Sequence, residues 1–103
     1  MGLLEEARPL YEEDLQAERE SYGDRDPRTL TSINLLAHLL EEQGKLVEAI
    51  PLRTERLEGL VLLYGMEHQQ TRGAAERLVS TLREAGQQEE AEALADKHAL
   101  AGN

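Results

Sequence analysis

Apolar residues in the middle of the chain recur with the spacing of an α-helix. One stripe predicts a helix over about 28–43, because its members lie three, four and seven positions apart: Ile33, Leu36, Ala37 and Leu40. A second stripe predicts a longer helix that ends before Gly65: Leu46, Ala49, Leu52, Leu57 and Tyr64. Gly44, between the stripes, permits the left-handed turn that closes a helix. We therefore expect two antiparallel helices joined by a tight turn.

The same pattern returns after 42 residues. At this shift Gly2 aligns with Gly44 and Gly86, and Pro9 aligns with Pro51. A period between about 20 and 50 residues is typical of stacked units that bury a continuous core together. By phase, the other helices are expected at 3–22, 69–85 and 87–101. The sequence therefore predicts an all-α fold, a solenoid of five antiparallel helices.

We expect residues 1–103 to form one repeat domain that is part of a longer array. The domain holds about two and a half units, at 2–43, 44–85 and 86–103. Either Thr29 or Asp26 can cap the helix that starts near residue 28. Pro9 and Pro51 lie one to two turns inside the long helices, and their recurrence at one phase indicates a tolerated kink.

The predicted core consists of the apolar positions that share these stripes. It comprises Leu4, Ala7, Leu10, Tyr11, Leu15, Ile33, Leu36, Ala37, Leu40, Leu46, Ala49, Leu52, Leu57, Leu78, Leu82 and Leu94.

Three segments give the repeat a family likeness. They are EARPLYEEDL at 6–15, DPRTLTSINLLA at 26–37 and QGKLVEA at 43–49. Over nearly the whole chain the sequence resembles the 42-residue tetratricopeptide repeats of the kinesin light chain type. The resemblance implies a right-handed superhelix of helix pairs whose concave side, lined by the shorter helices, binds peptide segments of other proteins.

The chain departs from that family pattern at two positions of the long helix. Arg53 and Ala95 stand where the first unit has the aromatic ring of Tyr11. The second position is usually small in the family, and larger residues occupy it in all three units: Asp14, Arg56 and His98.

The resemblance places Asn34 on the concave face, where its amide can both donate to and accept from a peptide backbone. By phase we expect seven further residues to face the same groove: Thr31, His38, Glu41, Gly73, Glu76, Ser80 and Arg83. Glu76 stands at the equivalent of Asn34, so the second unit carries a different group there. The alternative for Asn34 is an ordinary polar residue bonded to a neighbouring helix.

Four consecutive apolar residues distinguish the second unit from the first. Leu60, Val61, Leu62 and Leu63 stand where the first unit has polar residues at 18–21. Successive positions cover the whole circumference of a helix, so one or two join the core and the others need a cover. That cover is either a symmetric copy, which makes a homodimer, or the terminal helix.

Composition narrows the class of partner. The 21 acidic and 11 basic residues leave a formal charge of −10, which repels nucleic acid and anionic membranes. Residues 1–26 hold nine carboxylates against three basic groups, so a basic protein partner is favoured near that end. The start of the chain lacks the basic and apolar segments of a signal peptide, and we expect a cytoplasmic protein.

No arrangement of catalytic residues is present. His38, His68 and His98 are thirty residues apart on different helices, and no metal-protease, nucleophile-elbow or phosphate-loop motif occurs. We expect neither an enzyme nor a cofactor or metal site. The first hypothesis is a protein-interaction scaffold that binds a peptide in its groove; the alternative is a repeat array that mainly self-associates.

Overall fold

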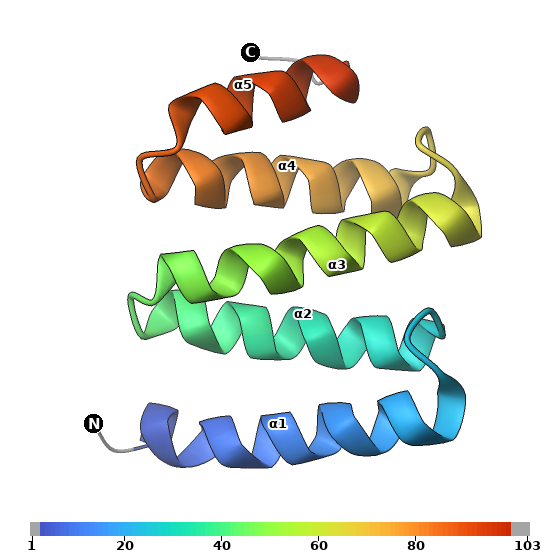
Figure 1. Cartoon of the computed structure of the whole chain (residues 1–103), viewed down its shortest axis with the longest axis vertical. Helices are drawn as coiled ribbons and strands as arrows, with labels where there is room; N and C mark the ends of the chain where they lie inside the picture. Colours follow the sequence, from blue (N-terminus) through green and yellow to red (C-terminus); the bar gives the residue numbers. More distant parts are fainter. Residues whose placement is uncertain (1–2, 100–103) are drawn as a thin grey trace.

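The computed structural model describes residues 3–99, and the side chains of residues 5–99. All regular elements in this part of the chain are helices: α1 (Leu3–Tyr22), α2 (Pro27–Glu42), α3 (Leu46–Tyr64), α4 (Gln69–Glu84) and α5 (Gln88–Lys97). The helices stack in sequence order, and each packs only against the next (Figure 1). The antiparallel helical solenoid that the sequence predicts is therefore confirmed.

The helix boundaries follow the repeat. The shorter helices α2 and α4 begin at Pro27 and Gln69, and the following helices α3 and α5 begin at Leu46 and Gln88. Both pairs of starting residues are 42 positions apart. Helices α1 and α3 continue through Pro9 and Pro51, each of which has an exposed side chain. The predicted end of the last helix, at 101, lies outside the described residues.

Glycine closes each of the shorter helices. Gly44 has φ +79° and Gly86 has φ +84°, the left-handed conformation expected from the sequence. In the first of these turns the Lys45 amide donates to the Leu40 carbonyl at 2.8 Å, and Gln87 repeats this bond to Leu82 at the same length. These bonds satisfy carbonyls at the helix end and fix where the next helix starts.

Asp26, rather than Thr29, caps α2. The Asp26 carboxylate accepts a hydrogen bond from the Arg28 amide at 2.9 Å. Thr29 is buried, and its hydroxyl donates to the Gly23 carbonyl at 2.7 Å. One unit later the Thr71 hydroxyl donates to the Leu60 carbonyl at 3.3 Å, so both threonines tie a short helix to the end of the helix before it.

The core runs along the stack where helices meet. Most of the predicted positions are buried or pack against the core. The prediction for Leu10 is wrong: its side chain is 61% exposed, because α1 packs only against α2. Leu52, at the same phase in α3, is partly buried because α3 lies between two helices. Leu4 lies outside the residues whose side chains are described.

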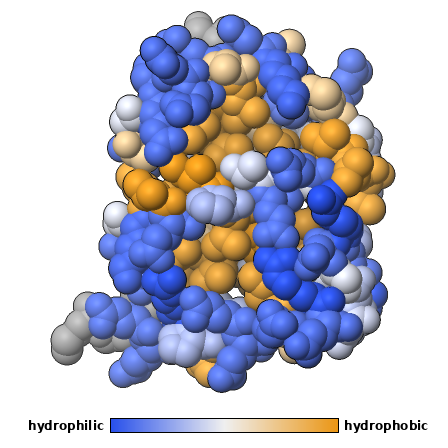
Figure 2. All heavy atoms as spheres, in the orientation of Figure 1, coloured by the Kyte–Doolittle hydropathy of each residue, from blue (hydrophilic) through white to orange (hydrophobic). Residues whose placement is uncertain are grey.

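Several buried positions were not predicted. They are Leu30, Leu39, Leu60, Ala74, Ala75, Val79, Ala91 and Ala95, together with the polar residues Thr29, Arg53, Thr71, Thr81 and His98. On the surface drawn in Figure 2, apolar atoms gather over the upper helices α3, α4 and α5, whereas the α1 end is largely hydrophilic.

Candidate functional site

The candidate site is a hollow of about 480 Å³ between α2, α3 and α4. Its lining combines polar, cationic and small side chains: Asn34, Leu35, His38, Arg53, Arg56, Gln70, Gly73, Ala74 and Arg77. Both shorter helices contribute to it, and Asn34, which the family likeness assigns to the groove, is among its lining residues. Three of its nine lining residues are arginines, in a chain whose net charge is −10.

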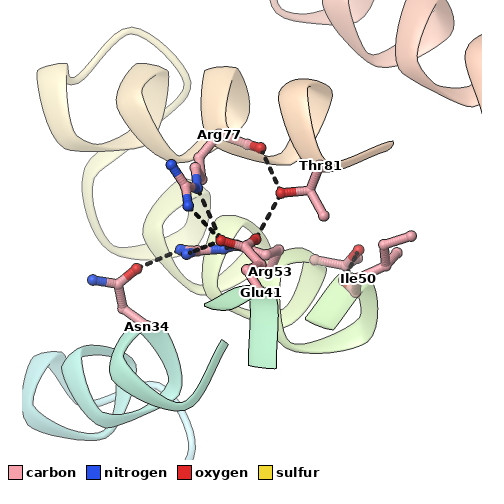
Figure 3. Close-up of polar contacts among 7 residues, drawn as sticks. Asn34, Glu41, Ile50, Arg53, Arg77 and Thr81 are labelled. Atoms are coloured by element: carbon pink, nitrogen blue, oxygen red, sulfur yellow. Dashed lines mark hydrogen bonds and ion pairs between the residues drawn. The ribbon is translucent and has the colours of Figure 1, made fainter. Parts of the chain in front are cut away.

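Glu41 binds two of the arginines that line this hollow (Figure 3). Its carboxylate accepts two hydrogen bonds from Arg53, at 2.9 and 3.1 Å, and one from the Thr81 hydroxyl at 2.7 Å. Arg77 adds a bond from Nε at 3.2 Å and another from Nη2. Glu41 therefore joins α2, α3 and α4 through a single carboxylate.

The Glu41–Arg53 pair is almost inaccessible, with side chains 7% and 4% exposed. Burial alone would raise the pKa of Glu41, but hydrogen bonds from Arg53, Thr81 and Arg77 outweigh it and lower the pKa to about 2. The carboxylate is therefore ionised at neutral pH. Because its oxygens are already shared among three partners, Glu41 braces the groove and offers little to a ligand, which limits its predicted role as a groove contact.

Asn34 is held by the same network. Its Oδ1 accepts a hydrogen bond from Nη1 of Arg53, so the amide oxygen is bonded to a neighbouring helix. The amide nitrogen has no hydrogen bond within the described part of the chain, and Asn34 is one of the residues that line the hollow. This arrangement fixes the amide orientation and leaves its two N–H donors available to a ligand carbonyl.

Arg56 differs from Arg53 although both come from α3 and line the hollow. Its side chain is partly buried and has no hydrogen bond or ion pair with any described residue. Burial, followed by repulsion from Arg53, lowers the pKa of Arg56, yet a guanidinium stays protonated at neutral pH. The hollow therefore contains one half-buried positive charge that no residue of the described part of the chain neutralises.

Of the eight groove residues predicted from the sequence, Asn34, His38 and Gly73 line this hollow. His38 Nε2 lies 3.3 Å from a carboxylate oxygen of Glu42. Glu76 borders a separate hollow and Arg83 borders another. Thr31 and Ser80 are exposed, and the Thr31 hydroxyl donates to its own helix at 3.0 Å. The predicted set is therefore spread over several surfaces, and whether it contacts a ligand stays a prediction.

Four polar residues that line the hollow were not predicted from the sequence: Arg53, Arg56, Gln70 and Arg77. The prediction assigned the groove to the exposed faces of the shorter helices, whereas Arg53 and Arg56 come from the longer α3. A signal was present, because Arg53 and Arg56 are two departures from the family pattern. Arg56 stands at the position that is usually small in the family and lines the hollow, whereas Arg53 replaces an aromatic residue and is buried between the helices.

The apolar run at 60–63 divides between core and surface. Leu60 is 3% exposed and belongs to the core, so it is removed from the predicted self-association surface. Val61 is partly buried, and Leu62 and Leu63 are 71% and 41% exposed. For these three residues self-association stays a prediction.

The described residues contain no group of three or more histidine, aspartate or glutamate side chains placed to hold a metal ion. Between residues 3 and 99 no helix combines the length and apolar character that crossing a membrane requires.

Comparison with known proteins agrees with the geometry. The sequence model described as tetratricopeptide repeat matches residues 1–60, more than half of the chain. No curated protein matches the chain. Helix pairs with a 42-residue period, stacked in sequence order around a polar groove, are the structural counterpart of that match. The chain belongs to the tetratricopeptide repeat family.

Proposed function

We propose that the chain is a non-enzymatic protein-interaction module that holds an acidic peptide segment of a partner in the hollow between α2, α3 and α4. Tetratricopeptide repeats generally mediate protein–protein interactions. The likeness to the kinesin light chain type supports the concave side as the place of binding. The observation that carries the acidic specificity is Arg56.

A guanidinium that is partly removed from water and lacks a counterion destabilises the folded chain. A carboxylate of a bound peptide would supply the missing counterion, and the planar fork of arginine favours two parallel hydrogen bonds to it. Arg53 cannot take this role because its donors already meet Glu41 and Asn34. Arg77 also binds Glu41, so Arg56 is the one arginine of the hollow that has no partner among the described residues.

Two neighbouring groups suit the rest of an extended peptide. The Asn34 amide nitrogen can donate to a backbone carbonyl, in an orientation that Arg53 fixes. Leu35 also lines the hollow and is largely exposed, so it offers apolar contact to a peptide side chain. The peptide class that fits is an extended segment with a carboxylate next to an apolar residue.

The basic partner expected from the acidic surplus at 1–26 concerns a different surface. That surplus lies on α1 and the following loop, whereas the hollow is lined by α2, α3 and α4. Charges more than about 8 Å apart are largely screened at physiological salt, so the two ends of the stack can select partners of opposite charge. Binding of a basic partner to α1 stays a separate proposal.

The test compares an acidic peptide with its amide counterpart. A fluorescein-labelled peptide with alternating glutamate and leucine is titrated against the chain by anisotropy, next to the same peptide with glutamine for glutamate. We expect Arg56→Gln to weaken the acidic peptide by about 10- to 100-fold, the usual effect of losing hydrogen bonds to a charged group. Arg25→Gln, an exposed arginine outside the hollow, is the matched control and should change little. Equal binding of the two peptides, or equal affinities for the chain and its Arg56→Gln form, would refute the acidic groove.

A further inference from the structure

The arginines of the hollow between α2, α3 and α4 carry more positive charge than the chain neutralises. Arg53, Arg56 and Arg77 all line it, and none of its nine lining residues is acidic. Among the described residues, Glu41 is the one carboxylate that any of the three arginines binds. Every acidic side chain of the sequence lies within this part of the chain. Two of the three guanidinium charges are therefore left without a counterion.

Arg77 differs from Arg53 in how much of its guanidinium is engaged. Arg53 is 4% exposed, and all three of its nitrogens donate to Glu41 or Asn34. Arg77 is 47% exposed and reaches Glu41 from α4 through Nε and Nη2 (Figure 3). Its Nη1 makes no hydrogen bond with a described residue. Arg77 therefore keeps N–H donors for a ligand while it holds Glu41, and Arg56 keeps all of its own.

Space for a ligand lies next to these donors at Gly73. This glycine lines the same hollow one turn of α4 before Arg77, and an added Cβ there would meet no atom within 4 Å. Two amides complete the donors of the lining: the free Nδ2 of Asn34 and the side chain of Gln70. The hollow thus surrounds an open space with charged and uncharged N–H donors.

Two kinds of ligand could supply two negative charges, and they differ in geometry. In an extended segment successive side chains point to opposite faces, so two carboxylates that enter one hollow are about 6.6 Å apart along the chain. A phosphoryl group on serine, threonine or tyrosine carries about −1.5 to −2 charges at pH 7 and has three acceptor oxygens on one atom. One such group can meet Arg56 and Arg77 together, and the planar fork of arginine favours paired bonds to its oxygens.

We propose that the hollow recognises a phosphorylated side chain of its peptide ligand, with Arg56 and Arg77 bound to the phosphoryl oxygens and Asn34 to the neighbouring backbone. Phosphorylation of the partner then controls its binding to this chain. Because the ligand occupies the hollow described above, this specificity rests on the proposed function. A single carboxylate needs Arg56 alone, whereas the second negative charge of a phosphoryl group also needs Arg77.

Three fluorescein-labelled peptides test this specificity by anisotropy at pH 7.5. They share alternating glutamine and leucine and differ at one central residue, which is phosphoserine, glutamate or glutamine. We expect the phosphopeptide to bind at least about tenfold more tightly than the glutamate peptide, and the glutamine peptide to bind most weakly. Arg77→Gln should reduce the preference for phosphoserine over glutamate to less than about threefold, whereas Arg77→Lys, which keeps the charge, should retain more of it than Arg77→Gln does.

The matched control removes an arginine from another surface. Arg25 is exposed and lies outside the hollow, so Arg25→Gln should leave the preference for phosphoserine unchanged. Circular dichroism of each variant verifies that the fold is retained, which matters for Arg77 because it also binds Glu41.

Several results would overturn the phosphoryl specificity. Equal affinities of the phosphoserine and glutamate peptides would do so and leave the acidic groove intact, whereas equal binding of all three peptides, or none, would refute the acidic groove itself. A preference that Arg77→Gln leaves untouched would remove Arg77 from the site. A peptide with two glutamates two positions apart that matches the phosphopeptide would show that two charges suffice. Inorganic phosphate that displaces the phosphopeptide at a concentration equal to the peptide's own Kd would assign the hollow to free phosphate.

Discussion

Replacing Glu41 by glutamine tests whether a single carboxylate holds three helices together. The substitution keeps the shape of the side chain and removes the charge that Arg53 and Arg77 share. Arg53 is 4% exposed and would be left as a buried cation whose remaining acceptor is the neutral Asn34 oxygen. Removing one partner of a buried ion pair typically costs about 3 to 5 kcal/mol. We therefore expect Glu41→Gln to lower the free energy of unfolding by several kcal/mol.

The pKa of Glu41 supplies an independent magnitude. A fall from the ordinary value of 4.5 to about 2 corresponds to about 3 kcal/mol of stability at neutral pH, and to about 2 kcal/mol once the solvent that reaches Arg77 is considered. Because the folded-state pKa is depressed, this stability is fully present above pH 4.5. It is lost as the pH falls from 4.5 towards 2, because in this range Glu41 takes up a proton in the unfolded chain but stays ionised in the folded chain.

Urea unfolding followed by circular dichroism at pH 7, 5, 4 and 3 measures this effect. We expect the difference between the unaltered chain and Glu41→Gln to be about 2 to 4 kcal/mol at pH 7 and to shrink steadily below pH 4.5. Glu76→Gln, an exposed carboxylate on α4, is the control and should stay within about 0.5 kcal/mol of the unaltered chain. A difference that is the same at pH 7 and pH 3 would refute the assignment of this stability to the Glu41 charge.

Two further pairs of substitutions test the packing. Gly59→Ala should lower stability by about 1 to 3 kcal/mol, because the new Cβ meets buried Leu30, whereas Gly73→Ala, which meets nothing within 4 Å, should raise it by about 0.5 to 1 kcal/mol. Urea midpoints that shift in the same direction for both would contradict this account. Thr71→Val should lower stability by about 1 to 2 kcal/mol, since it removes the hydroxyl that bonds the Leu60 carbonyl, and Thr31→Val, on an exposed site, should change it less. Thermal unfolding measures this pair, and equal midpoints would show that the Thr71 bond adds nothing.

The elements of the fold were predictable because their signals are local. Gly44 ends α2 through a backbone conformation that depends on that residue and its neighbours. The bounds of α2 and α3 follow from stripes within each helix, and the period transfers them to the other helices. Leu10 was misassigned for the converse reason: its stripe is correct, but its burial depends on whether a second helix packs on that face of α1.

The candidate site was predictable only in part, because its key contacts join distant positions. Glu41 meets Arg77 across 36 residues and Thr81 across 40, and no pattern within one helix specifies such pairs. The family likeness singled out Asn34 and the helical phase added His38, and both line the hollow. Arg56 was noted as a departure from the family pattern, but an isolated cation is ordinarily exposed. Its position beside the hollow follows from the packing of α3 between α2 and α4.

One position of the repeat holds a different residue in each unit, and two of these residues line hollows of the structure. The phase that the family usually fills with a small residue holds Asp14, Arg56 and His98 in successive units. Asp14 is exposed on α1, which has a packing partner on one side only. Arg56 lines the groove, and His98 lines a second hollow, of about 460 Å³, between α3 and α5. At this phase the second and third units therefore contribute a polar group to a hollow, because their helices have neighbours on which a hollow can form. The positions that keep the period build the stack, while this phase, where the period breaks, gives two hollows part of their polar lining.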